Sequence, residues 1–474
     1  MQAPYISRRS LLATAVTGGA AALLAQPAGM LDAALGSPSA AGDATAAIDP
    51  TGVHQGGITT PGQQHLQLGA FDLKPGITKA QLVALLQDWQ LAIGTLAKGQ
   101  PLPGADTPAT APFDTGEALG QYADRLTITI GFGPSLFDGR FGLATQRPAA
   151  LVDIPAFTGD ALNAALSNGD LSVQCCAENR LVAGHALRAL ARIGQDRATL
   201  RWVQQGFNEA PAQPGQGAGR NLFGFKDGTA NLDAGDPVRM ARNVWVDPSD
   251  GPAWMAGGTY QVYRRVYTKL RLWDESSLSE QEDSIGRRRL SGAPFGGVNE
   301  TDRVDNALTP VTSHIRLANP RTGQASEDER ILRRGYSFHD GLDAAGEYDA
   351  GLAFIAYQRD PRRQFVPMQT RLAESDALNE YLVHTASAIF AVPPGTTAAG
   401  FIGETLLGTA PPRVTVPNPA ADLGTPPPGS PAPAPAPAPG PAPAPAPGGT
   451  VPRPPAPTKP RKRKKTRRPL RKRA

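Results

Sequence analysis

The chain has 474 residues, which is long enough for a well-buried core and for more than one domain. Its formal charge of +5 is unevenly distributed. The 12 lysines and arginines from Arg453 onward have no acidic counterpart, so residues 1–452 carry a charge of −7. The two cysteines, Cys175 and Cys176, are adjacent, which excludes a small fold held together by disulfides. Beyond the N-terminal segment, no stretch is long and apolar enough to span a bilayer as a helix.

The first 45 residues have the pattern of an export signal. Two arginines, Arg8 and Arg9, precede a pair of leucines and a soft apolar run over residues 13–25. The pattern resembles a twin-arginine signal, with cleavage expected between Ala41 and Ala47. An ordinary secretory signal with a chance arginine pair is the alternative. The twin-arginine route carries folded proteins, so it would suit a chain without disulfides that loads any cofactor before export. We expect an extracellular, cell-envelope or periplasmic location.

The first half of the body, residues 50–220, alternates predicted strands and helices. Alternating apolar residues predict strands, and apolar residues at helical spacing after a capping residue predict helices. The segment with both cysteines is expected to be a buried strand in which cysteine acts as a small apolar residue. In chain order we expect strands at 64–71, 125–130, 171–177 and about 201–203, with helices from 79, capped by Thr78, and at 179–193.

The second half of the body, residues 221–415, repeats this pattern with longer connections. We expect strands at 259–266 and 351–357 and helices at 277–288 and 378–389, the last of which contains His384. These elements predict an α+β fold of two related halves, each a helix-covered antiparallel sheet. The pairing of the strands does not follow from the sequence.

The C-terminus differs from the body in composition. Residues 425–458 are nearly all proline, alanine and glycine, so they cannot form a core and are expected to be an extended spacer. Residues 459–474 form a basic tail. We expect this tail to bind a polyanion or the cell envelope, and an inert solubilising tail is the alternative.

The first unusual motif is Gly224-Phe-Lys-Asp227-Gly228, which presents a carboxylate in a glycine-flanked loop. Glycines allow the backbone to approach a bound group closely. An Asp-Gly turn with a solvated carboxylate is one alternative. A calcium loop with Asn231, Asp233 and Asp236 as further ligands is another, but it lacks the spacing and the closing glutamate of an EF-hand.

The second motif, His314-Ile-Arg-Leu-Ala-Asn-Pro-Arg321, contains one of the six histidines. Histidine is the usual protein ligand of haem iron, but a single histidine is more often a surface or hydrogen-bonded residue. Other chemistries lack their motifs. The sequence has no Cys-x-x-Cys-His for covalently attached haem, no His-Glu-x-x-His for zinc proteolysis and no Gly-x-Ser-x-Gly for a serine hydrolase.

The third motif is Ile331-Leu-Arg333-Arg334-Gly-Tyr-Ser-Phe338, an arginine pair in an apolar context. Adjacent arginines are costly to bury without anionic partners, which favours a functional site. The alternative is a surface pair that is neutralised by the acidic residues at positions 327–329.

Together the three motifs resemble those of the dye-decolourising peroxidase family. The match is close to the exported branch, which includes the deferrochelatase/peroxidases of bacterial iron uptake. The similarity extends over the body from His54 to Gly395 and includes Arg242-Asn-Val-Trp-Val246 and Ser291-Gly-Ala-Pro294. The C-terminal spacer and tail are not part of the family pattern.

The resemblance implies two ferredoxin-like halves of the dimeric α/β-barrel type, with haem b held mainly by the C-terminal half. His314 would be the axial ligand of the iron, and Asp376 would accept its other ring N–H, which favours oxygen–oxygen cleavage. Asp227 would be the base toward hydrogen peroxide, and Arg333 would stabilise the developing charge. The positions that match haem contacts are Gly228, Thr229, Asn319, Pro320, Arg321 and Arg333.

The implied activity is that of a haem-dependent peroxidase that reduces hydrogen peroxide and oxidises dyes, phenolic compounds or other organic electron donors. Bulky donors would pass electrons through aromatic residues, although each of these is also explained as core packing. The candidates are Trp202, Trp245, Trp254, Trp273 and Tyr336.

Two other functions remain open at this point. An iron- or haem-acquisition protein of the deferrochelatase type would use the same haem site. A cell-surface adhesin, in which the basic tail is the functional part, is a third hypothesis, and the intact Asp227, His314 and Arg333 argue against it. We expect a homo-oligomer.

Overall fold

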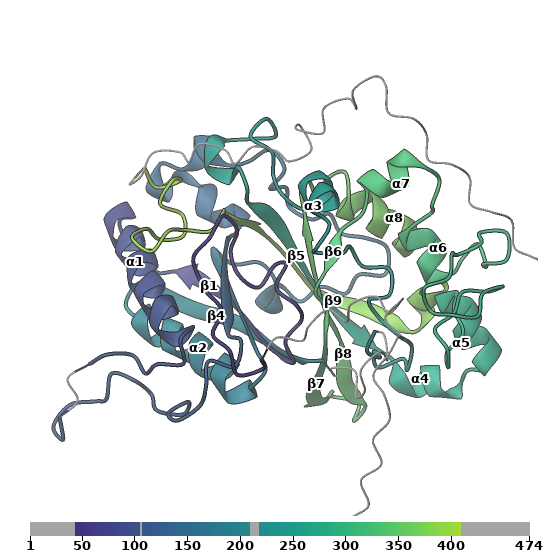
Figure 1. The fold of residues 1–474 in the computed structure, drawn as a ribbon, viewed down its shortest axis with the longest axis horizontal. Helices are drawn as coiled ribbons and strands as arrows, with labels where there is room; N and C mark the ends of the chain where they lie inside the picture. Colours follow the sequence, from purple (N-terminus) through teal and green to yellow (C-terminus); the bar gives the residue numbers. More distant parts are fainter. Residues whose placement is uncertain (1–42, 105–106, 209–217, 409–474) are drawn as a thin grey trace, which may run out of the picture. The chain divides into compact units, whose positions relative to one another are not determined.

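The computed structural model describes residues 43–104, 107–208 and 218–408, all of which belong to one unit, Met1–Asp422 (Figure 1). The predicted export signal, apart from its last residues, and the predicted spacer and basic tail lie outside the described residues. Among the residues that are described, no helix is long and apolar enough to cross a membrane.

The described residues of the N-terminal half contain four strands and two α-helices, joined in part by short 3-10 helices, and all but the longer β4 lie close to the bounds expected from the sequence. Strands β1, β3 and β4 pair in the order β3-β1-β4, and β2 pairs with the free edge of β3. Thr78 caps α1 with a reciprocal capping box, in which the Gln81 side chain accepts from the Thr78 backbone. The elements are β1 (His65–Leu73), α1 (Lys79–Leu96), β2 (Thr127–Phe132), β3 (Leu171–Ala177), α2 (Arg180–Ile193) and β4 (Ala198–Phe207).

The C-terminal half contains the remaining strands and the helices near the site. Its strands pair in the order β9-β5-β8-β7, and the two-residue β6 pairs with the same edge of β8 as β7 does. The elements are α3 (Pro237–Asn243), β5 (Thr259–Thr268), α4 (Leu270–Glu275), α5 (Leu278–Ile285), α6 (His314–Ala318), α7 (Gln324–Asp328), β6 (Leu332–Arg333), β7 (Tyr336–Leu342), β8 (Tyr348–Gln358), α8 (Phe365–Ser375) and β9 (Leu382–Val392).

The two halves join edge to edge into one antiparallel sheet. β2 meets β9 where Phe132 lies opposite Ala391, and β4 meets β7 where Phe207 lies opposite Ser337. Because β5 pairs with both β9 and β8, the strands close into a β-barrel. The molecule is therefore an α+β protein that contains a barrel, with α1 and α2 against the N-terminal strands and α3–α8 beside the C-terminal ones (Figure 1).

Both faces of the central strands are buried, as the cysteine pair shows. Successive residues of a strand point to opposite faces. Cys175 accordingly packs in the core that contains Trp89 and Leu187, whereas Cys176 packs inside the barrel with Tyr336. Both thiols are free and fully buried, which confirms the prediction of a buried strand with cysteine as a small apolar residue.

The predicted helix at 378–389 is wrong. Residues Ala377–Glu380 form one 3-10 turn, and β9 then begins at Leu382, so His384 lies on a strand. The segment has apolar residues at helical spacing, but it is rich in small and β-branched residues, and pairing with β5 supplies its backbone hydrogen bonds. The sequence also failed to reveal α8. The helix expected at 277–288 is shorter, because Gly286 adopts the left-handed conformation with a φ of 92°.

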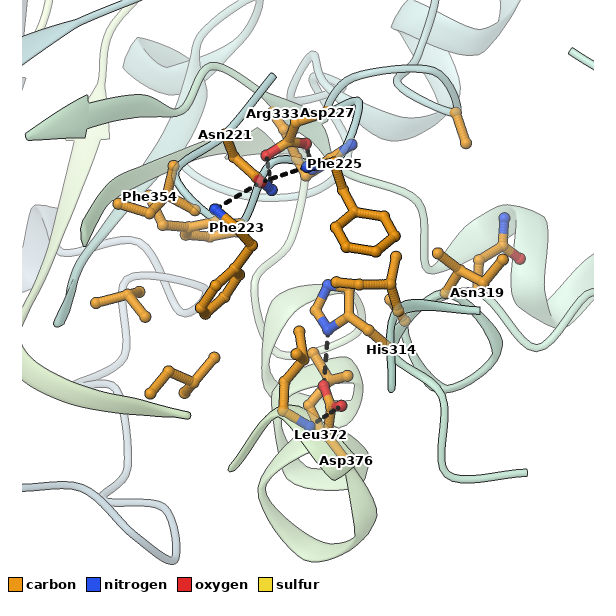
Figure 2. Close-up of a pocket in the computed structure, with 18 of the residues that line it drawn as sticks. Asn221, Phe223, Phe225, Asp227, His314, Asn319, Arg333, Phe354, Leu372 and Asp376 are labelled. Carbon is orange, nitrogen blue, oxygen red and sulfur yellow. Dashed lines mark hydrogen bonds and ion pairs between the residues drawn. The ribbon is translucent and has the colours of Figure 1, made fainter. Parts of the chain in front are cut away.

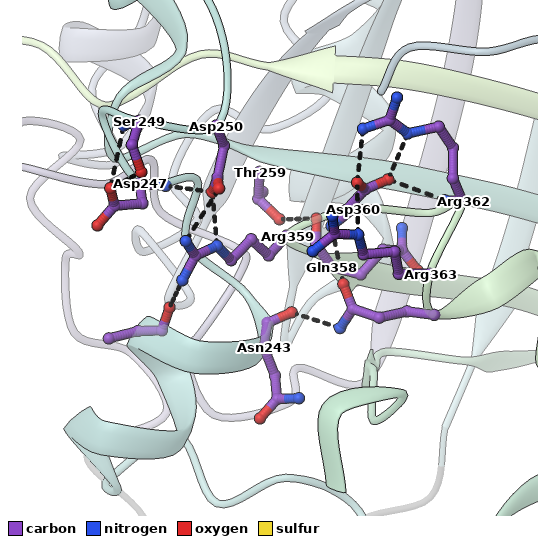
Figure 3. Close-up of polar contacts among 12 residues, drawn as sticks. Asn243, Asp247, Ser249, Asp250, Thr259, Gln358, Arg359, Asp360, Arg362 and Arg363 are labelled. Carbon is purple, nitrogen blue, oxygen red and sulfur yellow. Dashed lines mark hydrogen bonds and ion pairs between the residues drawn. The ribbon is translucent and has the colours of Figure 1, made fainter. Parts of the chain in front are cut away.

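A polar network fixes the connection between β8 and α8 (Figure 3). The Arg359 guanidinium donates to both carboxylate oxygens of Asp250 at 2.5 and 3.0 Å, and its backbone N–H donates to the Asn243 carbonyl at 2.8 Å. The Gln364 amide also donates to the Asn243 carbonyl, at 2.8 Å. These bonds hold the start of α8 against the end of α3, and α8 ends at Asp376 in the site described next.

Candidate active site

A cavity of the C-terminal half lies between strands β5, β8 and β9 and helices α5, α6 and α8. Its walls are mostly apolar and include Phe223, Phe225, Phe354 and Leu372 (Figure 2). His314 and Asp376 lie on one side of this cavity, and Asp227, Arg333 and Asn221 lie on the other side. The structure thus brings together the key residues of the three motifs, Asp227, His314 and Arg333, which are up to 106 positions apart in the sequence.

His314 is the first residue of α6, and its ring is held by the end of α8. Its Nδ1 lies 2.7 Å from Oδ2 of Asp376, which caps the C-terminus of α8. The other carboxylate oxygen accepts the backbone N–H of Leu378 at 2.9 Å. A carboxylate at Nδ1 places the ring proton there and leaves the Nε2 lone pair free, and Nε2 points away from Asp376 (Figure 2).

The negative charge of Asp376 favours the protonated form of the His314 ring when no metal is bound. Burial by itself lowers the pKa of His314, but the carboxylate of Asp376 raises it, and the net pKa lies above the ordinary value. The Asp376 side chain is only 3% exposed, so its charge is poorly screened.

On the opposite side, Asp227 and Arg333 form an ion pair. Nη1 of Arg333 donates to Oδ1 of Asp227 at 2.8 Å, and the Asn221 amide lies 3.5 Å from Oδ2. Burial raises the pKa of Asp227, whereas the charge and hydrogen bond of Arg333 lower it, with smaller contributions from His314 and Asn221. The net pKa lies below the usual range, so Asp227 stays ionised to low pH.

Local structure aims both side chains at the cavity. Arg333 lies in β6 opposite Ala356 of β8. The Asn231 side chain accepts from the Arg333 N–H at 2.9 Å and donates to its carbonyl at 2.7 Å. Gly228 has a φ of 108°, which favours glycine, and so lets the chain turn directly after Asp227.

The other residues predicted for the site are placed as follows. Gly228, Thr229, Asn319 and Arg321 also line the cavity. Pro320 is not among the lining residues, and its carbonyl accepts from the Asn306 side chain at 2.7 Å. The calcium alternative finds no support, because Asp236 caps α3 and the described residues contain no group of three histidine, cysteine, aspartate or glutamate side chains that could hold a metal ion.

Sequence reasoning missed several residues that line the cavity. Arg287, Arg330 and the expected Arg321 form a cationic cluster, and each donates to backbone carbonyls. Burial, with Arg287 and Arg330 nearby, lowers the pKa of Arg321 to about 10. Arg287 and Arg330 lie in stretches with several arginines, and nothing in the sequence distinguishes them from arginines at the surface.

His384 also lines the cavity, as a consequence of its place on β9. The buried Arg264 donates from Nε to Nδ1 of His384 at 3.3 Å and forms an ion pair with Asp160. Burial, Arg264 and His314 lower the pKa of His384 to about 3, so this histidine is neutral at physiological pH.

A histidine with a free Nε2 that faces an acid and an arginine across an apolar cavity is the arrangement expected of a haem enzyme that activates peroxide. Models of the Dyp-type peroxidase N-terminal and C-terminal domains match residues 55–208 and 218–397. The chain belongs to the Dyp-type peroxidase family. It is therefore an enzyme, a peroxidase, with haem as its cofactor.

Named relatives agree with this membership. The chain is 40% identical over 367 residues to the deferrochelatase of Escherichia coli (strain K12), covering 75% of this chain and 86% of the relative. A DyP-type peroxidase from Streptomyces coelicolor and ferric DtpA from Streptomyces lividans are each 40% identical, with a TM-score of 0.71. Each match covers 77% of this chain and 98% of the solved chain.

Proposed function

We propose that the protein reduces hydrogen peroxide and oxidises dyes, phenolic compounds or other organic donors at the cavity between His314 and the Asp227–Arg333 pair. The opposition of these groups across one apolar cavity supports this assignment most directly. Asp227 and Arg333 are proposed as the peroxide-activating pair, and His314 as the axial ligand of haem b.

The residues of the cavity fit haem b. The Nε2 of His314 is available as a ligand because Nδ1 is bound to Asp376. The apolar walls suit a porphyrin face. The cationic cluster of Arg287, Arg321 and Arg330 would suit the two carboxylates of haem b. The absence of a Cys-x-x-Cys-His motif leaves non-covalent binding.

When bound, haem supplies the iron at which the oxygen–oxygen bond of hydrogen peroxide is cleaved. Asp227 would accept a proton from one oxygen of hydrogen peroxide and return it to the other oxygen, which leaves as water when the oxygen–oxygen bond breaks. Arg333 would stabilise the negative charge that develops on the departing oxygen. Asp376 would give His314 anionic character. Gly228, Thr229, Asn319, Pro320 and Arg321 are proposed as haem contacts.

A deferrochelatase-like role in iron or haem acquisition is the second candidate. It is favoured by the 40% identity to proteins named deferrochelatase. Both functions would use haem in the same cavity. They differ in the product that is formed. A peroxidase oxidises its donor, whereas a deferrochelatase releases iron and leaves the porphyrin intact.

One set of measurements tests both functions. The purified protein should show a Soret band that acid–organic extraction removes, and it should oxidise a dye or phenol when hydrogen peroxide is added. Release of iron with recovery of intact porphyrin, without turnover of the donor, would instead support the second function. Absence of a Soret band after reconstitution with haem b would refute both.

Four finer assignments are also proposed. The N-terminal half has the order strand, helix, strand, strand, helix, strand, and the C-terminal half has the same order once its additional helices and the short β6 are set aside. The sheet orders β2-β3-β1-β4 and β7-β8-β5-β9 also support two ferredoxin-like halves. Residues 50–220 and 221–415 are the proposed bounds of these halves. Export through residues 1–45 by the twin-arginine route is supported by the arginine pair and the lack of disulfides. The protein is proposed to be a homo-oligomer.

The basic tail is proposed to tether the enzyme to a polyanion or to the cell envelope. It has 11 lysines and arginines between Lys459 and Arg473, and the spacer 425–458 could extend on the order of 100 Å in polyproline form. Truncation after Gly424 should preserve turnover of a small soluble donor but abolish retention on heparin at low salt. Equal retention of the truncated and full-length proteins would exclude the tether.

A further inference from the structure

Glu300 lies outside the wall of the cavity, yet its carboxylate holds the loop that carries Asp227. One oxygen of Glu300 accepts from Lys226 Nζ at 2.5 Å. The other accepts from Thr229 Oγ1 at 2.5 Å and from the backbone N–H of Ala218 at 3.3 Å. The partners include the residue before Asp227 and the residue two positions after it. A single carboxylate therefore spans the turn from which Asp227 reaches the cavity.

The Glu300 carboxylate is largely buried, which strengthens its attraction to Lys226. The side chains of Glu300 and Lys226 are 12% and 17% exposed, so their attraction is less screened than that of a surface pair. Burial raises the pKa of Glu300, but Lys226, Thr229 and the Ala218 N–H lower it, and the net pKa lies below the ordinary value. The backbone carbonyl of Glu300 also accepts from Arg287 of the cationic cluster at 2.8 Å.

The neighbouring backbone leaves room for this pair. Gly292 has a φ of 75°, and a Cβ at this position would lie 2.7 Å from Cδ of Lys226 and 3.4 Å from Cγ of Glu300. A side chain there would displace the Lys226–Glu300 pair.

Besides Glu300, the loop of Asp227 is held by backbone hydrogen bonds, among them a β-bridge between Arg220 and Lys226, and by the contacts of Asp227 itself. Its carboxylate is bound by Arg333 and Asn221, and its N–H donates to the Gly219 carbonyl at 2.8 Å. Gly228 follows it and adds no side chain to hold the turn. A loop that contains glycine at this point has many backbone conformations available unless its flanks are fixed.

We propose that Glu300 is a positioning residue for peroxide activation, because it fixes Lys226 and Thr229 and thereby sets the direction of the Asp227 carboxylate. The proposal rests on the proposed role of Asp227. A misplacement of about 1 Å at a reacting group can cost on the order of 10²-fold in rate. We therefore expect Glu300→Ala to lower the second-order rate constant with hydrogen peroxide by about 10–100-fold.

The matched variants separate positioning from general stability. Glu178 is a suitable control, because its side chain is 14% exposed and forms a 2.7 Å ion pair with Arg125 in the N-terminal half. Glu178→Ala should keep the rate constant of the wild-type protein. Glu300→Gln retains an acceptor for Thr229 but loses the charge opposite Lys226, so it should lose less activity than Glu300→Ala and supplies a well-folded alternative. Haem content and Tm are measured for every variant.

The decisive experiment is a double-mutant cycle with Asp227→Asn on haem-loaded protein. If Glu300 acts through Asp227, the double variant should be no slower toward peroxide than Asp227→Asn alone. Cyanide, which sheds a proton on binding, provides a readout independent of turnover, and its dissociation constant should rise in Glu300→Ala but not in Glu178→Ala.

Two results would overturn the proposal while leaving the role of Asp227 intact. In one, Asp227→Asn is slow but Glu300→Ala and Glu300→Gln react like the wild-type protein. In the other, the two losses multiply in the double variant. A third result, in which Asp227→Asn itself reacts at the wild-type rate, would refute the role of Asp227 and this proposal with it.

Discussion

The two sides of the cavity are built differently. His314 and Asp376 belong to helix termini, and Asp376 is fixed by the backbone of the turn that follows α8. Asp227 lies on a glycine-containing loop, and Arg333 lies on a two-residue strand. Hydrogen bonds that the Asn221 side chain donates and that the Asn231 and Glu300 side chains accept hold this second side together.

The difference indicates that the two sides of the cavity have different roles. The His314 side is anchored by regular backbone structure, which suits a group that must hold a cofactor in one place. The Asp227 side presents both members of its ion pair to the cavity, with 29% and 31% of the two side chains accessible, whereas on the other side only His314, at 37%, is accessible and Asp376 is buried. This suits groups that exchange protons and stabilise charge on a small substrate. We expect variants on the first side to affect haem binding, and variants on the second side to affect the rate.

The largest effect is expected from His314→Ala, which removes the proposed iron ligand. Most of the haem should be lost, because the remaining contacts are apolar packing and the cationic cluster. Soret absorbance per protein after purification and reconstitution measures this. His339→Ala is the control, since His339 is exposed on β7. Full occupancy and an unchanged spectrum in His314→Ala would contradict the assignment.

Asp227→Asn and Arg333→Leu should bind haem normally but react slowly with hydrogen peroxide. Loss of a positioned base costs roughly 10²–10⁴-fold, and loss of charge stabilisation costs roughly 10²–10³-fold. The losses should not add fully in the double variant, because the two side chains act as one pair. Stopped-flow measurement of the Soret change after mixing with peroxide gives the rate constants. Wild-type rates in both variants would place peroxide activation elsewhere.

The sequence pointed to the residues that meet in the candidate site more completely than to the elements of the C-terminal half, and the roles of these residues stay predictions. His314, Asp227 and Arg333 lie in short contiguous motifs, which can be recognised in the sequence even when the pairing of the strands is unknown. The strand β9 was mistaken for a helix because a strand buried in mid-sheet loses the alternation that marks an exposed face. Arg287, His384 and Glu300 were missed because they reach the site only through tertiary contacts.

Asp376→Asn should have a smaller effect than either change on the Asp227 side. Asparagine can still accept the ring N–H of His314, but it lacks the charge that makes the ring a stronger ligand. Haem affinity or the peroxide rate constant should fall by about 10–100-fold. Haem titration and stopped-flow kinetics distinguish these outcomes. Asp236→Asn, at the cap of α3, serves as the control. Unchanged values for both quantities would mean that Asp376 only orients the ring.

The smallest expected effect is a shift in pH dependence. Asp227 must be ionised to accept a proton, so the peroxide rate constant should fall as the pH drops through its pKa. Arg333 is what holds this pKa below the usual range against the opposing effect of burial. Removing the cation in Arg333→Leu leaves burial dominant, so the pKa of Asp227 rises and the acid limb moves to higher pH. Arg333→Lys keeps a positive charge and should shift the limb less. A pH profile of the peroxide rate constant for the three proteins measures the shift. An acid limb at the same pH in all of them would show that Arg333 does not set the ionisation of Asp227, and the two residues would then contribute to the rate independently.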